Sequence, residues 1–158
     1  MIDRWDRGRA EVDQLIEQSR LTEVTPNPEL ADHYISQAHT HLKAAETLRE
    51  QDPAGAFTLA YDAARLSLAS ILVVQGLRPR GEGAHAVLLE VAIFQLEPPR
   101  QKEIREFDWM RRLRNDTQYP DVDRPTAGVD DVDQAIPAAR AIVERAERLV
   151  GIMPPYRG

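Results

Sequence analysis

The chain of 158 residues contains no cysteine, and it has few aromatic residues and only two lysines. The absence of cysteine excludes disulfides, thiolate metal sites and a cysteine nucleophile. No uninterrupted apolar run approaches the ~18 residues of a membrane span, and the first residues lack the apolar core of a signal peptide. We therefore expect a cytoplasmic protein without a membrane partner, and no residue pattern indicates a cofactor.

Positive charge is scarce over the whole chain but concentrated in one segment. The formal net charge is -6, which argues against a non-specific DNA coat. The segment from Arg100 to Arg114 nevertheless holds six basic and three acidic residues. Arginine replaces lysine almost everywhere, which fits either a GC-rich coding bias or phosphate binding.

Apolar residues recur at helical spacing along most of the chain, and no strand pattern of real length is present. Asn27-Pro28 and Asp52-Pro53 are typical helix starts, whereas Gly76 and Gly151 are typical stops. The predicted helices cover residues 9–19, 28–50, 53–76, 84–96, 99–118 and 130–151. The pattern predicts an all-α fold, an antiparallel four-helix bundle with an extra N-terminal helix.

Three parts of the chain are expected to differ in role. Residues 1–27 would form an N-terminal helical extension, residues 28–151 the bundle, and residues 152–158 a loose tail. The helix over 53–76 has two apolar rows, so it should be the central, buried helix.

Arg114 is the residue whose position most needs explaining. With Ile104 at zero and ~100° per residue, Phe107 and Met110 fall near 300° and 240°. Arg114 falls near 280°, between them, and so points along the core-facing arc. A guanidinium there is costly to desolvate unless it is paired or lines a polar cleft.

Other polar residues offer weaker signals. His39 and His41 face different directions on a helix, and no metal site is expected. His85 opens a helix and is either a capping or core histidine or a catalytic one. The glycines at 81 and 83 do not form a phosphate loop, because no strand precedes them and the Lys-Ser/Thr is missing. Asp62 either pairs locally with Arg65 or reaches across the bundle to orient an arginine such as Arg114.

Several short motifs together resemble the HEPN-domain family, in particular its small prokaryotic members. The motifs are Phe57-Thr58-Leu59-Ala60-Tyr61-Asp62-Ala63-Ala64-Arg65, Gly83-Ala84-His85, and Leu113-Arg114-Asn115 before Tyr119. The likeness covers roughly residues 28–150. It implies a HEPN-like helical bundle that forms a homodimer, in which two Arg-polar-x-x-x-His motifs face each other across a cleft.

The resemblance also implies a chemistry. Active members cut RNA without a metal, the histidine handling the 2′-hydroxyl proton and the arginine stabilising the charged phosphorane. Many members are toxins, or are encoded beside a small nucleotidyltransferase that acts as antitoxin. Residue by residue, Arg114 matches the motif arginine, Asn115 the polar residue and Tyr119 the position of the histidine, so all three are candidate catalytic residues. Arg111, Arg112 and Arg114 are the candidate RNA-binding residues, with Asp62, His85 and Asp116 in support.

Tyr119 stands where the motif has its histidine. A phenol, with a pKa of ~10, is deprotonated in only about one part in a thousand at neutral pH, so it is a poor general base. In some related pairs the nucleotidyltransferase adenylylates a tyrosine beside the motif, and Tyr119 is a candidate for that modification.

Three functions remain open. The first is a HEPN-like component of a toxin–antitoxin or defence pair that binds RNA or nucleotide with weak or no cleavage. The second is an active metal-independent ribonuclease in which Tyr119 or His85 replaces the histidine. The third is a non-catalytic protein-interaction module in which Arg114 is only a buried structural charge.

Overall fold

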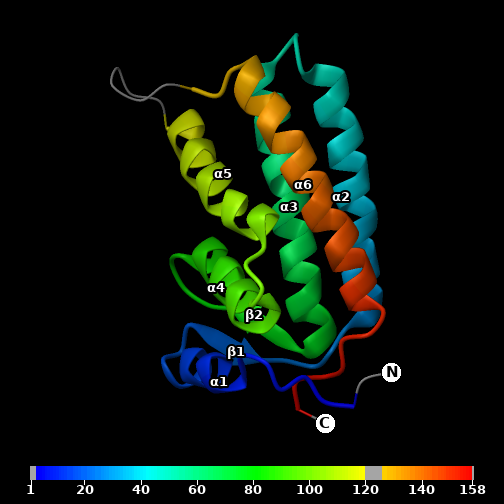
Figure 1. Cartoon of the computed structure of the whole chain (residues 1–158), viewed down its shortest axis with the longest axis vertical. Helices are drawn as coiled ribbons and strands as arrows, with labels where there is room; N and C mark the ends of the chain where they lie inside the picture. Colours follow the sequence, from blue (N-terminus) through cyan, green and yellow to red (C-terminus); the bar gives the residue numbers. More distant parts are fainter. Residues whose placement is uncertain (1–2, 120–125, 158) are drawn as a thin grey trace.

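The computed structural model describes residues 3–119 and 126–157, which form six helices and one two-stranded sheet (Figure 1). In chain order the elements are α1 (Arg9–Glu17), β1 (Leu21–Glu23), α2 (Pro28–Leu48), α3 (Pro53–Gln75), β2 (Leu77–Pro79), α4 (Ala84–Leu96), α5 (Lys102–Gln118) and α6 (Val129–Val150). The prediction of an all-α fold is confirmed. Most of the loop predicted after α5 lies outside the described residues.

Helices α2 and α3 begin at the same local signal. The Asn27 side chain accepts a hydrogen bond from the N–H of Leu30 at 3.0 Å, and Asp52 accepts one from the N–H of Gly55 at 2.9 Å. Each cap satisfies an amide that a helix leaves without a partner at its N-terminus. At the other end of α3, Gly76 adopts φ +80°, as a glycine stop requires. Residues at the ends themselves therefore mark where these helices begin and where α3 ends.

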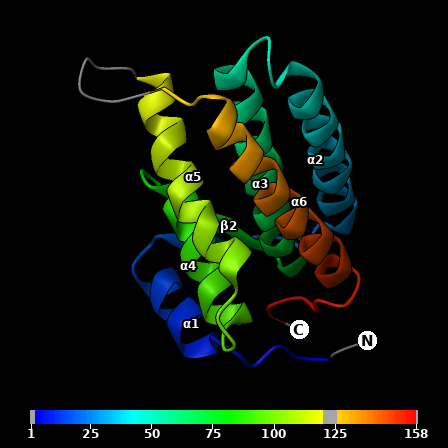
Figure 2. The same ribbon diagram turned by 45° about the horizontal axis from the view of Figure 1, so that its top comes forward.

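Helix α3 is the central helix, as its two apolar rows predicted. It packs most extensively against α2 and α6, which run alongside it in both views (Figure 1, Figure 2). By length and composition α3 could cross a membrane, although the sequence holds no uninterrupted apolar run of that length, because Asp62 and Arg65 interrupt it. In the structure 67% of that apolar window is buried, as expected for the core helix of a bundle.

A short antiparallel ribbon was not predicted. Strands β1 and β2 pair Leu21 with Pro79 and Glu23 with Leu77, and the ribbon joins the N-terminal extension to the end of α3. Leu21 and Leu77 are fully buried. Strands of three residues are too short to show an alternating pattern, so sequence periodicity could not find them.

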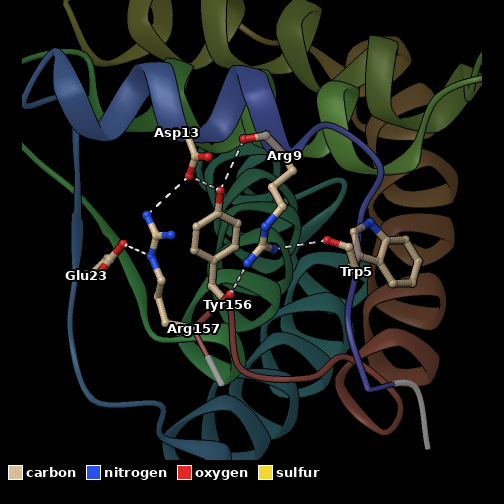
Figure 3. A network of polar contacts seen from close by, with 6 residues as sticks. All are labelled: Trp5, Arg9, Asp13, Glu23, Tyr156 and Arg157. Carbon is tan, nitrogen blue, oxygen red and sulfur yellow. Dashed lines mark hydrogen bonds and ion pairs between the residues drawn. The ribbon is translucent and has the colours of Figure 1, made fainter.

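The expectation of a loose C-terminal tail is wrong. Tyr156 is only 3% exposed, its N–H donates to the carbonyl of Gln75 at 2.8 Å, and its hydroxyl donates to Asp13 Oδ1 at 2.5 Å. The guanidinium groups of Arg9 and Arg157 flank the ring, with Cζ 4.4 and 5.4 Å from its centroid (Figure 3). The tail therefore binds α1 to the end of α3, and we call its contacts through Tyr156 and Arg157 the clasp.

Helices α4 and α5 lie on the side of the bundle away from α2 (Figure 1, Figure 2). The buried side chains of Gln75 on α3 and Gln95 on α4 exchange two amide hydrogen bonds of 2.9 and 2.8 Å. This reciprocal pair satisfies both amides away from water. It fixes the C-terminal end of α4 against the C-terminal end of α3.

Candidate functional site

A cleft of about 790 Å³ lies between the start of α4 and the C-terminal half of α5. Tyr61 lines it from α3. The loop before α4 and the first turn of that helix contribute Gly81, Gly83, Ala84, His85 and Ala86, and α5 contributes Arg111, Arg112, Arg114, Asn115 and Asp116. The cleft therefore brings together most of the candidate residues, although α4 and α5 are separated by a loop and carry them some 30 positions apart in the sequence.

Arg114 turns inward, as the helical arc predicted. Its guanidinium carbon lies 5.6 Å from the centroid of the Tyr61 ring, a cation–π arrangement. Its Nε is buried and has no hydrogen-bond partner among the described residues. The charge is thus held over an aromatic face at the wall of the cleft.

Tyr61 is a site residue that sequence reasoning named only within a family motif on the central helix. Its side chain is fully buried, and its ring stacks on Phe107 with centroids 5.2 Å apart. Its hydroxyl lies 2.8 Å from Nδ1 of His85. A phenol in an otherwise apolar seam needs a polar partner, and that requirement was the available signal. Burial raises the pKa of Tyr61 to about 12.

His85 occupies the first turn of α4 and faces the same cleft. Burial lowers the pKa of His85 below its ordinary value, and the positive charges of Arg65 and Arg114 lower it further. The Asp62 carboxylate acts in the opposite direction but more weakly than these. The imidazole is therefore neutral at pH 7.

Asp62 does not orient Arg114. Its Oδ1 lies 3.3 Å from Nε of Arg65, one turn away on the same helix, so the local ion pair is the correct alternative. Between Asp62 and Arg114 the described part of the chain shows no hydrogen bond or ion pair. The charge of Asp62 nevertheless acts on His85 and Tyr61 in the cleft.

Arg111 and Arg112 share one carboxylate that sequence reasoning did not single out. Asp108 Oδ1 lies 2.8 Å from Arg111, and its Oδ2 lies 2.7 Å from Arg112. Arg111 Nε is nevertheless buried and, like that of Arg114, without a hydrogen-bond partner in the described ranges. The Asp108 carboxylate therefore holds both guanidinium groups at the cleft. It leaves the buried Nε–H of Arg111 without an acceptor.

The N-terminus of α4 opens onto the cleft. Gly83 precedes the helix with φ +79°, and no side chain caps it. The amides and dipole of a helix start favour an anion. A strand, β2, does end at Pro79 shortly before Gly81, so the premise that no strand precedes these glycines is wrong. The Lys-Ser/Thr of a phosphate loop is still absent from this segment.

The remaining candidates divide between the cleft and its outside. Asn115 and Asp116 line the cleft, and α5 ends just before Tyr119. Tyr119 is 64% exposed and lies outside the residues that line the cleft. Within residues 3–119 and 126–157, no three His, Asp or Glu side chains gather as a metal site.

These features define an all-α bundle protein with an arginine-rich cleft. The HEPN domain family model matches residues 31–149, and the chain belongs to this family. Membership indicates a nuclease-like or RNA-binding module. Neither the curated proteins nor the solved structures include a match to this chain.

Proposed function

We propose that this protein is a HEPN-like component of a toxin–antitoxin or defence pair that binds RNA or a nucleotide in the α4–α5 cleft and cleaves it weakly or not at all. One observation carries the proposal. The Nε atoms of Arg111 and Arg114 are both buried at the cleft and lack acceptors among the described residues. A phosphate in the cleft could not reach these enclosed Nε atoms directly, but it would pair with the guanidinium charges that the described residues leave partly unsatisfied.

The charge of the cleft favours an anionic ligand. Arg111, Arg112 and Arg114 line it, whereas Asp116 is its only acidic lining residue among those described. Guanidinium groups recognise phosphate through paired N–H donors. The uncapped start of α4 adds a partial positive charge on the opposite wall. The proposal therefore does not depend on the overall net charge, which is -6.

Weak cleavage follows from the place of Tyr119. The motif histidine would stand at this position, but Tyr119 is exposed outside the cleft. A general base must reach the proton that it removes, within about 3 Å or through one water. Arg114 can bind and stabilise a phosphate without such a base.

An active metal-independent ribonuclease is the second candidate, and one observation favours it. His85 lines the cleft with Arg114, so an imidazole and a guanidinium are present together in spite of the missing motif histidine. The third alternative, a non-catalytic interaction module, would require Arg114 to act only in stability.

The proposal includes a cytoplasmic homodimer in which the two clefts form a shared groove. It also includes a nucleotidyltransferase-type partner, and family membership supports both parts. The exposed ring of Tyr119 is accessible to adenylylation by such a partner.

Mixing the protein with labelled single-stranded RNA in EDTA separates the candidates. We expect a retained complex and intact RNA, with the complex lost in Arg114→Ala and kept in Arg148→Ala, an exposed arginine on α6. Cleavage that disappears in Arg114→Ala would favour the ribonuclease. Absence of binding, together with a loss of stability in Arg114→Ala, would favour the interaction module.

A further inference from the structure

The Tyr61 hydroxyl connects the buried core to the first turn of α4. Its oxygen lies 2.8 Å from His85 Nδ1, and in the described part of the chain no other hydrogen-bond partner reaches it. A buried hydroxyl that donates to nothing carries the full cost of its lost hydration. The Tyr61 proton is therefore directed at Nδ1.

We propose that Tyr61 is a positioning residue that holds neutral His85 in the tautomer with its proton on Nε2. A neutral imidazole carries one N–H and one acceptor nitrogen. If Nδ1 accepts from Tyr61, the ring proton lies on Nε2, a nitrogen with no hydrogen-bond partner among the described residues. His85 then offers the cleft a hydrogen-bond donor.

The electrostatics of both groups agree with this assignment. Burial raises the pKa of Tyr61 to about 12, so the phenol keeps its proton at neutral pH. Burial, Arg65 and Arg114 lower the pKa of His85, so the imidazole is neutral there. The stack of Tyr61 on Phe107 and the start of α4 at Ala84 hold the two partners in place.

This inference rests on the proposed function and narrows its ligand. The guanidinium groups of Arg111 and Arg114 are donors only, and an Nε2–H on His85 makes the imidazole a donor as well. Such a set suits phosphate oxygens, which accept hydrogen bonds. An imidazole in this tautomer cannot take the proton of a 2′-hydroxyl through Nε2, so His85 does not act as a general base through that nitrogen.

Nitrogen NMR reads the tautomer directly. The full chain, labelled with ¹⁵N, is studied at about pH 8, where ordinary imidazoles are neutral, and His85→Gln identifies the His85 signals. We expect Nδ1 without a proton and Nε2 with one. Tyr61→Phe, which keeps the ring stack, should give a mixture of tautomers, whereas Tyr34→Phe on α2 should leave the wild-type pattern. A proton on Nδ1 of wild type, or an unchanged pattern in Tyr61→Phe, overturns the inference.

A binding readout separates this inference from the proposed function. His85→Gln keeps an N–H donor near the position of Nε2, so it should bind labelled RNA about fivefold more tightly than His85→Leu. Equal binding by the two variants contradicts a donor role for His85. A single Nε2–H tautomer in a protein that binds neither RNA nor a nucleotide would instead overturn the proposed function and leave the tautomer assignment intact.

Discussion

At the scale of single residues, Arg114 combines an unfavourable and a favourable interaction. Its position over Tyr61 contributes about 0.5–2 kcal/mol of cation–π attraction. Its buried Nε lacks an acceptor in the described structure, and an unsatisfied buried donor costs about 1–3 kcal/mol, more when it is charged. The two contributions are of similar size, and an anion in the cleft would add a favourable interaction with the guanidinium charge.

The altered pKa of His85 predicts a pH dependence of stability. The groups that act on this imidazole are those of Tyr61, Arg65, Arg111, Arg114 and Asp62. Its pKa is lower in the folded protein than in the unfolded chain. The unfolded chain then binds the proton more tightly, so stability falls as the pH drops through about 6.5. Denaturant unfolding at roughly pH 5.5 and 8 should show a smaller difference in His85→Gln than in wild type. An equal difference in both proteins would contradict the assignment.

Sequence reasoning found part of the site at this scale. The inward turn of Arg114 followed from helical spacing, because that spacing is local. The Tyr61–His85 contact depends on how α4 packs on α3, which no local pattern specifies. The same limit applies to Asp62, whose two possible partners could be separated only by the folded arrangement.

At the scale of elements, the junction of α3 and β2 depends on Gly76. A Cβ at this position would lie 2.5 Å from the carbonyl oxygen of Val24, and φ is +80°. Helix ends of this kind were predictable because their caps are residues of the ends themselves. The β1–β2 ribbon beside Gly76 was not predictable, because its partners are more than 50 residues apart and each strand has only three residues.

Gly76→Ala should therefore lower the unfolding free energy more than alanine at another glycine with positive φ. Gly81, at φ +72°, is the matched control, since a Cβ there meets nothing within 4 Å. Both variants incur about 1–2 kcal/mol of backbone strain. Gly76→Ala should lose at least a further ~1 kcal/mol of unfolding free energy through the collision with Val24. Equal losses, measured by urea denaturation, would show that the close approach is unimportant.

At the scale of the whole molecule, segments near the two ends of the chain contact each other, because an N–H of Arg9 donates to the carbonyl of Tyr156 at 2.6 Å. Trp5 donates from Nε1 to the carbonyl of Gln95 at 3.1 Å, and Arg157 Nε donates to Glu23 at 2.7 Å (Figure 3 shows Arg157 and Glu23). The terminal segments therefore contribute to the same packed structure as the helices that carry the cleft. Sequence composition missed this, because a short tail with two prolines carries no periodic signal.

The clasp predicts a large effect from a residue near the C-terminus. Tyr156→Ala should lower the unfolding free energy by about 3 kcal/mol, because it removes a buried ring and its bond to Asp13. Tyr119→Ala, which truncates the same side chain where it is 64% exposed, should change stability by less than about 0.5 kcal/mol. Similar losses in the two variants would refute the clasp.

The central claim is that the α4–α5 cleft binds the phosphates of RNA through Arg114. Fluorescence anisotropy of labelled single-stranded RNA, measured in EDTA over a series of salt concentrations, tests it most directly. For Arg114→Ala we expect weaker binding and a log–log salt slope smaller by about 0.7, since one phosphate contact is lost, and an unchanged slope for Arg148→Ala. Equal affinity and slope in wild type and Arg114→Ala would contradict the claim.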